Sequence, residues 1–523
     1  MRNVGSRIPA AAMLLAALGA GAAQVGAAEH PLRLNDALSL ALRRSEALES
    51  ARAGVGAAIG YEMGATGAYD PALELNGDAL HSTMPSSAAF LVSAAYPVAP
   101  DTRSAQLGVN VRQFLGTGGA VTLRANGSRQ TTEGALALLT PAYGAQLGAE
   151  LRQPVLRGRA TDPARLAMSV ASAGRRGAEA SLQAELNATL ADVERSYWVL
   201  VATRQVVSVR EQAVALAAEQ LEETRTRVTS GAVPGTELAQ PRAELERRRA
   251  DLLAARENLS RADNGLKLLI LRDEDSEPWG DTIAPADSGV IDSMALDRDA
   301  LMKRALAARP ELNVYAAGIS RREAETRSAQ DGEWPVLDAV VSYDRYGLAG
   351  SANPSGPAGP IPAGLNGDLG DAFHALGEGG YNAVRAGLVL GLPVGNREAR
   401  GATEAARQVE VQARADLARA RKEIRVEVLD ACAAVETATR RIEATHAARE
   451  AAEIQLAAEQ DRYGTGLSTN FLVLTRQNDL SSARLDEISA RTEYLIARTE
   501  LARATGSLSE DRGVGAMEIG GSR

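Results

Sequence analysis

Aromatic residues, cysteine and histidine are all scarce in this chain of 523 residues. Phe, Tyr and Trp make up only 3% of it, and there are four histidines and a single cysteine, Cys432. One cysteine excludes an intrachain disulfide framework and a cysteine-based metal cluster. The histidines stand in no metal-ligand spacing, and no Ser-His-Asp or paired-carboxylate pattern is evident. We therefore expect neither catalysis nor a bound metal or cofactor.

The chain is also poor in positive charge relative to negative charge. Its formal net charge is −9, which argues against a general nucleic-acid-binding protein because such proteins carry a basic face. Ala, Leu, Arg and Glu dominate long stretches instead. That composition favours long, narrow helices that pack through small and aliphatic side chains.

The first residues have the order of a secretory signal peptide. Arg2 and Arg7 precede an apolar run at 8–23, and small residues follow at 26–28. We expect residues 1–28 to be a signal peptide that is cleaved after Ala28; the alternative, an amphipathic helix, lacks a polar face. No later stretch of about 18 apolar residues occurs, so no transmembrane helix is expected.

The rest of the sequence contains two copies of one pattern. A shift of 264 residues superposes Leu48 on Leu312, and a shift of 235 residues superposes Gly231 on Gly466. Each copy is predicted to run from a short helix through a strand region into a very long helix, a tight turn and a second short helix. The predicted first repeat spans 29–271, with helices at 33–68, 163–228 and 236–271 and a strand region at 71–156. The second spans 297–506, with helices at 297–331, 396–462 and 471–505 and a strand region at 335–394. An acidic linker at 272–296 joins them, and a flexible tail is expected at 507–523.

The long helices carry apolar residues seven apart. One such series runs from Leu186 to Val228, and the second runs from Val428 to Tyr463 with Arg449 as its exception. Sustained sevens predict helices that pack side by side along their whole length, here about 100 Å. Two short helices stacked end to end match one long helix, so each repeat can form a two-helix wall. Four such columns are too few to enclose a wide space, and we therefore expect partner copies.

The strand regions alternate apolar and polar residues. Leu73 and Leu75, for example, alternate with Glu74 and Asn76. Such segments suit a barrel wall with lipid outside and water inside; the alternative is a soluble sandwich, which the export signal and the helix columns disfavour. A hairpin turn is expected at 116–119, whereas 347–380, with ten Gly and four Pro, is predicted to be a long loop. Six segments are strand-like, and the sequence leaves strand counts of four or six per chain open. Tyrosines near the strand ends are expected to form a membrane-interface girdle: Tyr96, Tyr143, Tyr343, Tyr346 and Tyr381.

Several short motifs, together with the order of elements that occurs in both repeats, resemble the TolC family of outer-membrane efflux proteins over roughly residues 32 to 506. They are Gln153-Pro154-Val155-Leu156-Arg157-Gly158, Arg309-Pro310-Glu311-Leu312, Leu392-Pro393-Val394 and the two helix-turn-helix elbows around Gly231 and Gly466. The resemblance implies a mainly α protein with a membrane β-barrel portion. It implies a homotrimer whose barrel is shared in the outer membrane and whose long helical hairpins form a tunnel into the periplasm. It also implies a passive exit channel of a tripartite efflux or type I secretion system, with a periplasmic adaptor and an inner-membrane pump as partners.

Function in such a channel is expected at the two elbows. Glycines at the turns, Gly231 and Gly466, can adopt the positive φ that a helix hairpin needs. By resemblance, the adaptor-contacting tip comprises Val228, Ser230, Gly231, Ala232, Val233, Thr465, Gly466, Leu467 and Ser468.

The resemblance also suggests residues that hold the tip shut. Tyr463 and Glu237 match a tyrosine and an aspartate of TolC, and they are expected to share a hydrogen bond, so that Tyr463→Phe raises the resting conductance. The aspartates that ring the TolC entrance correspond here to Leu472 and Thr475. Cation binding at the constriction is therefore not expected.

A second reading of the pattern is a periplasmic coiled-coil adaptor or scaffold, which also has long helical hairpins. Adaptors usually have one hairpin, whereas two hairpins and two strand regions are predicted here. Cell fractionation would separate the two, because a channel is found in the outer membrane and an adaptor of this kind is soluble.

Overall fold

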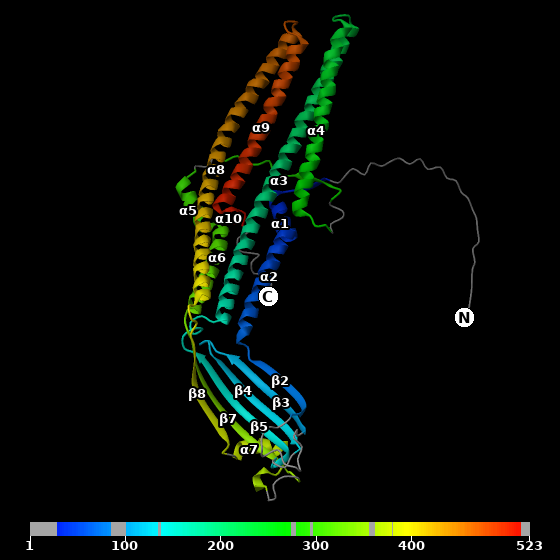
Figure 1. The fold of residues 1–523 in the computed structure, drawn as a ribbon. Coiled ribbons are helices and arrows are strands. Elements are labelled where there is room, and N and C mark those ends of the chain that lie inside the picture. The colour runs from blue at the N-terminus through cyan, green and yellow to red at the C-terminus, as the bar shows by residue number, and fades with distance from the viewer. Residues whose placement is uncertain are drawn as a thin grey trace, which may run out of the picture.

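The computed structural model describes residues 29–84, 101–133, 137–273, 279–292, 296–354, 361–378 and 380–513. A bundle of long helices lies at one end of the molecule and a single antiparallel sheet at the other (Figure 1). The predicted signal peptide, at 1–28, lies outside the described residues. The predicted tail begins with a short helix, α10 (Leu508–Asp511), whose Leu508 is buried, so its first residues are not flexible.

The helices form two closely matching sets. The first consists of α1 (Leu34–Arg44), α2 (Glu46–Thr66), α3 (Pro163–Thr229) and α4 (Ala239–Ile270). The second consists of α5 (Arg298–Ala308), α6 (Pro310–Gly332), α8 (Arg397–Gly464) and α9 (Asn470–Thr505). Both bounds of α1 and α5 differ by the 264 residues of the sequence repeat. No helix in the described ranges is both long and apolar enough to cross a lipid bilayer.

The long helices α3 and α8 each pair with two shorter helices. α3 contacts α2 in the half of the bundle near the sheet and α4 in the other half, and α8 contacts α6 and α9 in the same way (Figure 1). α3 also contacts α6 and α9, which joins the two pairs into one layer. The predicted arrangement, with two stacked short helices beside each long one, is confirmed.

Two predicted helices are interrupted in the structure. The helices expected at 33–68 and 297–331 are each divided, at Ser45 and at Arg309, where the backbone is extended (ψ 120° and 118°). Arg309 precedes Pro310, whose ring disfavours helical geometry in the residue before it. At Ser45, the hydroxyl accepts a hydrogen bond from the Leu48 amide and starts a new helix instead.

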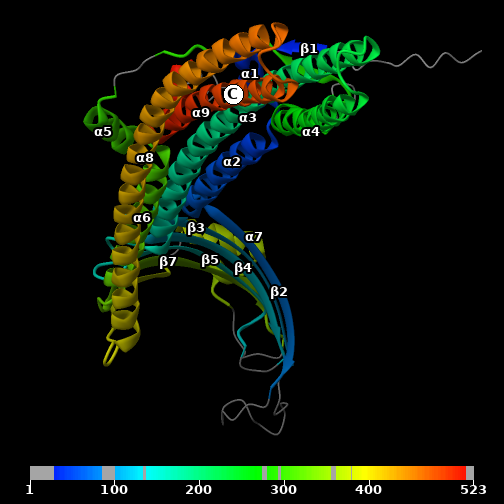
Figure 2. The ribbon, with the colours of Figure 1, turned by 90° about the horizontal axis from the view of Figure 1, so that it is seen from above.

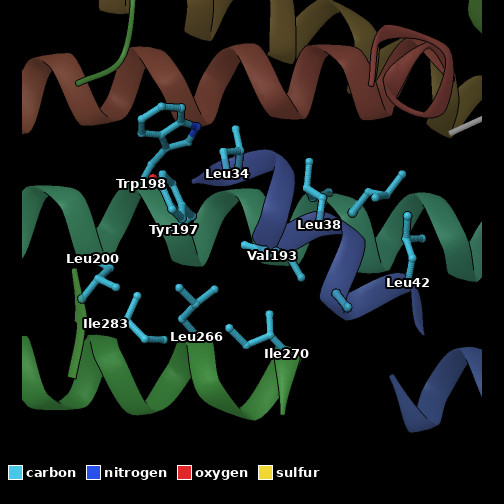
Figure 3. Close-up of a cluster of buried hydrophobic side chains, with 14 of the residues drawn as sticks. Leu34, Leu38, Leu42, Val193, Tyr197, Trp198, Leu200, Leu266, Ile270 and Ile283 are labelled. Carbon is cyan, nitrogen blue, oxygen red and sulfur yellow. The ribbon is translucent and has the colours of Figure 1, made fainter. Parts of the chain in front are cut away.

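A large apolar core lies midway along the bundle. It is built from Leu34, Leu38 and Leu42 of α1, Val193, Tyr197 and Leu200 of α3, and Leu266 and Ile270 of α4 (Figure 3). A matching cluster in the second repeat contains Cys432, which packs as a small apolar side chain. These clusters occupy the level where the short helices meet end to end.

The linker contributes a strand that the sequence did not reveal. β6 (Thr282–Pro285) pairs in parallel with β1 (Glu29–Leu32) beside α3 and α4. The Ile283 amide donates to the Asp263 carboxylate, and Asp263 forms a buried ion pair with Lys267 (2.6 Å). Part of the segment expected to be only a turn-rich joint is thus fixed to the core.

The sheet has six antiparallel strands in the order β2-β3-β4-β5-β7-β8. They are β2 (Ala72–Thr83), β3 (Asp101–Phe114), β4 (Ala120–Thr132), β5 (Leu139–Pro154), β7 (Val336–Ala352) and β8 (Asn382–Gly391). The turn predicted at 116–119 joins β3 to β4. The sheet as a whole is curved (Figure 2). The prediction of a long loop at 347–380 is wrong in part. β7 continues to Ala352, and a helix, α7 (Leu369–Glu378), follows.

Each face of the sheet has its own chemistry. Strand pairing places Leu75, Val109, Ala125 and Leu147 in one row, so they share an apolar face. The opposite face carries Arg124, Glu150, Arg152, Asp338 and Asp344, which form ion pairs across the strands. Tyr143 and Tyr343 belong to the apolar face, which is the face on which a membrane-interface girdle would lie. Tyr346 and Tyr381 belong to the polar face because the pleat alternates, and Tyr96 lies outside the described residues.

Candidate functional site at the helical tip

Both helical hairpins end at the same end of the molecule, far from the sheet (Figure 1). α3 turns through residues 230–234 and the 3₁₀ turn η2 (Gly235–Leu238) into α4, and α8 turns through 465–469 into α9. The two predicted elbows therefore lie together and form a tip.

The two elbows have the same backbone geometry. Gly231 has φ +77° and Gly466 has φ +78°. The next amide in each turn reaches back to the carbonyl five residues before it: Ala232 to Arg227 (2.9 Å) and Leu467 to Arg462 (2.8 Å). This is the Schellman ending of a helix, which favours glycine at the left-handed position. A Cβ at either glycine would meet no atom within 4 Å, so backbone conformation, not crowding, requires glycine there.

The outer surface of the second elbow is apolar. Leu467 is 81% exposed, and Phe471 beside it is 60% exposed. Of the other predicted tip residues, Ser230, Gly231, Ala232, Thr465 and Gly466 are exposed, whereas Val228, Val233 and Ser468 are half-buried. Phe471, in the first turn of α9, was not among the predicted tip residues.

The two hairpins are linked at the tip through Tyr463. The guanidinium of Arg227, in the last turn of α3, stacks on the Tyr463 ring in the last turn of α8, and it also pairs with Glu223 (3.2 Å). Burial raises the pKa of the Tyr463 hydroxyl, and the positive charge of Arg227 opposes that rise. The hydroxyl is therefore neutral at physiological pH.

The hydrogen bond expected between Glu237 and Tyr463 is not formed in this protomer. Glu237 is exposed, and within the described part of the chain its carboxylate has no hydrogen bond or ion pair. Of the other gate candidates, Leu472 is 39% exposed, and Thr475 hydrogen-bonds to the Phe471 carbonyl in its own helix (2.8 Å). Arg227, which the structure places against Tyr463, was not among the predicted gate residues.

Polar contacts join the hairpins below the tip. Arg247 of α4 donates to Asn478 of α9 (3.3 Å), and Arg484 of α9 donates to Gln212 of α3 (3.1 Å). No group of His, Cys, Asp or Glu side chains that could hold a metal ion occurs in the ranges that the structure describes.

Comparisons with known proteins agree with this architecture. Residues 301–507 match the family model described as outer membrane efflux protein. No curated protein sequence matches the chain.

Solved structures share the fold over almost the whole chain. The outer membrane channel CmeC of Campylobacter jejuni superposes with a TM-score of 0.63 at 15% identity, covering 91% of this chain and 85% of CmeC. The outer membrane protein VceC of Vibrio cholerae gives 0.63 at 18% identity, covering 90% and 96%. The open state of the MtrE channel of Neisseria gonorrhoeae gives 0.61 at 18% identity, covering 91% and 89%.

The family match lies in the second repeat, and the first repeat has the same helices and the same elbow. On this evidence the chain has the fold of the outer membrane channels, and residues 301–507 are similar to the outer membrane efflux protein family.

Proposed function

We propose that three copies of this chain form the exit channel of a tripartite efflux or type I secretion system. The observation that carries the proposal is the pair of open edges of the sheet. Among the described residues, β2 and β8 have no strand beyond them, and nearly all their residues are exposed. Long free edges invite further strand pairing. Pairing of β8 with β2 of the next copy satisfies both edges and closes the sheet into a barrel.

The dimensions of the two parts agree with a trimer. Three six-stranded sheets supply eighteen strands, which at about 4.8 Å spacing and about 40° tilt form a barrel about 36 Å wide. Twelve helix columns spaced about 8–10 Å apart form a ring about 30–38 Å wide. Twelve strands would give only about 24 Å. Six strands per chain thus continue the helical tunnel without narrowing it.

The faces of the sheet fit this closure. Arg152 and Asp338 pair on the polar face (2.7 Å), as do Arg124 and Glu150 (3.0 Å), and these groups would line the water-filled interior. The leucines of the opposite face would contact lipid. Transport is passive, and energy comes from the inner-membrane pump.

The tip is the proposed contact for a periplasmic adaptor. Leu467 offers exposed apolar surface on the second elbow, and Ser230, Gly231 and Ala232 are exposed on the first. We assign the gate to the Arg227–Tyr463 contact, with Glu237, Leu472 and Thr475 as further candidates. Opening would require the two hairpins to separate at this point.

Fractionation and co-purification test the proposal. We expect a trimer in the outer-membrane fraction that forms pores in planar bilayers and retains the adaptor and the pump. Leu467→Glu should abolish adaptor retention while leaving the trimer intact. Leu268→Glu is the matched control, because Leu268 is 70% exposed near the other end of α4. A soluble periplasmic protein without pore activity would overturn the proposal.

A further inference from the structure

One helix lies apart from the bundle, on the sheet. α7 packs against β4, β5 and β7 at the end of the sheet farthest from the long helices (Figure 1). Its Ala372 and Leu376 are buried against Ala145 of β5 and Ala349 of β7. The contact fixes a segment that the Gly- and Pro-rich sequence around it would otherwise leave as loop.

The helix packs on a row of small residues in the sheet, which we call the seat. Gly127, Ala145 and Gly347 lie directly opposite one another on three neighbouring strands. A Cβ at Gly347 would lie 1.8 Å from the Ala372 carbonyl oxygen, and a Cβ at Gly127 would lie 3.1 Å from the Phe373 ring. Larger side chains in this row would therefore displace α7.

The seat belongs to the apolar face of the sheet. Gly127 pairs with Leu107, which is 72% exposed, and Ala145 is two residues from Leu147 on the same side of β5. The ion pairs formed by Arg152 and Arg124 lie on the opposite face. In the closed barrel that we propose, α7 consequently lies outside the wall and not in the pore.

The height of the seat corresponds to the edge of a bilayer. Gly347 is eleven residues along β7 from Val336, where the sheet begins. That is about 36 Å along the strand, or about 28 Å along the barrel axis at a tilt near 40°. The apolar band of an outer-membrane barrel is about 25 Å tall. α7 therefore starts where the hydrocarbon ends.

An arginine on the apolar face supports this assignment. Arg345 lies opposite Leu147, and its guanidinium extends to the Gly377 carbonyl at the end of α7 (3.4 Å). Long cationic side chains on lipid-facing surfaces extend in this way toward the polar boundary. On the outer side of α7, Asp371, His374 and Glu378 are exposed.

We propose that α7 is an interfacial helix that rests in the lipid headgroup layer on the outer side of the membrane. Its apolar residues cover the sheet, and its acidic outer side lies among the headgroups. The helix would set the depth of the barrel in the bilayer. This inference rests on the proposed function, because it requires the apolar face of the sheet to face lipid.

Spin labels at three sites test the position of α7. His374→Cys, Leu147→Cys and Arg103→Cys would each be labelled in a Cys432→Ala background, as the full-length trimer in vesicles of phosphatidylethanolamine and phosphatidylglycerol. Collision with oxygen, relative to a water-soluble nickel chelate, reports depth. Leu147 marks the lipid-facing wall and Arg103 marks the far end of the sheet, and both are exposed. We expect the label at 374 to give an intermediate ratio.

Adding Gly347→Val provides the second measurement. It should lower the oxygen-to-nickel ratio at 374 to the value at 103, because α7 loses its seat, while the ratio at 147 stays unchanged. A water-like ratio at 374 in the absence of Gly347→Val, or no response to it, would overturn the inference. A water-like ratio at 147 would instead overturn the membrane barrel itself, so the two failures are distinguishable.

Discussion

The guanidinium carbon of Arg227 lies 4.3 Å from the centre of the Tyr463 ring, and this contact joins the ends of the two long helices. The two residues occupy different positions in the repeat, since Arg227 corresponds to Arg462 and Tyr463 to Val228. The contact therefore links the two hairpins through positions that are not equivalent in the repeat. An aromatic face and a cation attract each other by about 0.5–2 kcal/mol.

Removal of either partner should favour the open tip. We expect Arg227→Gln and Tyr463→Leu to raise the open-to-closed ratio about 2- to 30-fold, since about 1.4 kcal/mol is a factor of ten. Single-channel recording in planar bilayers measures this ratio. Tyr463→Phe retains the ring and should change conductance little. This differs from the expectation based on a hydrogen bond to Glu237.

Arg225→Gln is the matched control, because Arg225 lies on the same helix and pairs only with Glu222 among the described residues (3.4 Å). It removes one positive charge without touching Tyr463. If Tyr463→Phe opens the channel as much as Tyr463→Leu does, the hydroxyl and not the ring face holds the tip, and the contact with Arg227 is incidental.

The glycines of the elbows give a second prediction. Gly231→Ala and Gly466→Ala place a side chain at φ near +77°, which costs roughly 1–2 kcal/mol. Hydrogen exchange of the Ala232 and Leu467 amides should accelerate about 5- to 30-fold if the strained turn opens locally. Asn tolerates this conformation, so Gly466→Asn should accelerate exchange much less. Equal acceleration by Ala and Asn would contradict the conformational explanation.

Tyr197 makes stability depend on alkaline pH. Its hydroxyl lies 2.8 Å from the Asp287 carboxylate, to which it can donate, and 3.0 Å from the Leu32 carbonyl in the core. Burial together with that carboxylate raises its pKa well above the ordinary value. The stabilisation is present below about pH 10, where an unfolded tyrosine is neutral, and it is lost as the pH rises further.

Tyr197→Phe should therefore destabilise the protein by about 1–3 kcal/mol at neutral pH. Comparison of unfolding midpoints from pH 8 to pH 11.5 checks the sign, because the gap between wild type and variant should narrow above pH 10. A constant gap would show that the hydroxyl does not titrate in this way.

Replacing both Asp263 and Lys267, which form a buried ion pair, should destabilise the protein less than replacing Lys267 alone. Lys267→Met leaves an uncompensated carboxylate and should cost about 3–5 kcal/mol. Adding Asp263→Asn should recover part of that loss, because the amide oxygen can still accept from the Ile283 amide. Denaturant unfolding followed by tryptophan fluorescence measures both variants. Simple additivity of the two changes would contradict the pairing.

The helices were largely predictable because their signals are local and repeated. Apolar residues spaced seven apart from Leu186 to Val228 predict a continuous helix, and α3 ends at Thr229. The break at Arg309 was also visible in principle, since Pro310 follows it. The alternation of Leu73 and Leu75 with polar residues gave the faces of the sheet correctly.

Other features depend on contacts between distant residues. β1 and β6 are four residues each, and Glu29 pairs with Thr282, so neither strand has a pattern of its own. Leu369, Ala372, Phe373 and Leu376 of α7 have the spacing of an amphipathic helix, but the glycines around them hid it. Arg227 was overlooked because its partner belongs to the other repeat.

The unequal strand regions of the two repeats have a consequence for how such channels diversify. The first repeat contributes four strands and the second contributes two, yet their helices match in length. In the trimer that we propose, one additional hairpin per chain widens the barrel by six strands without changing the contacts between helices. The bore at the cell surface and the machinery at the periplasmic end can change independently of each other.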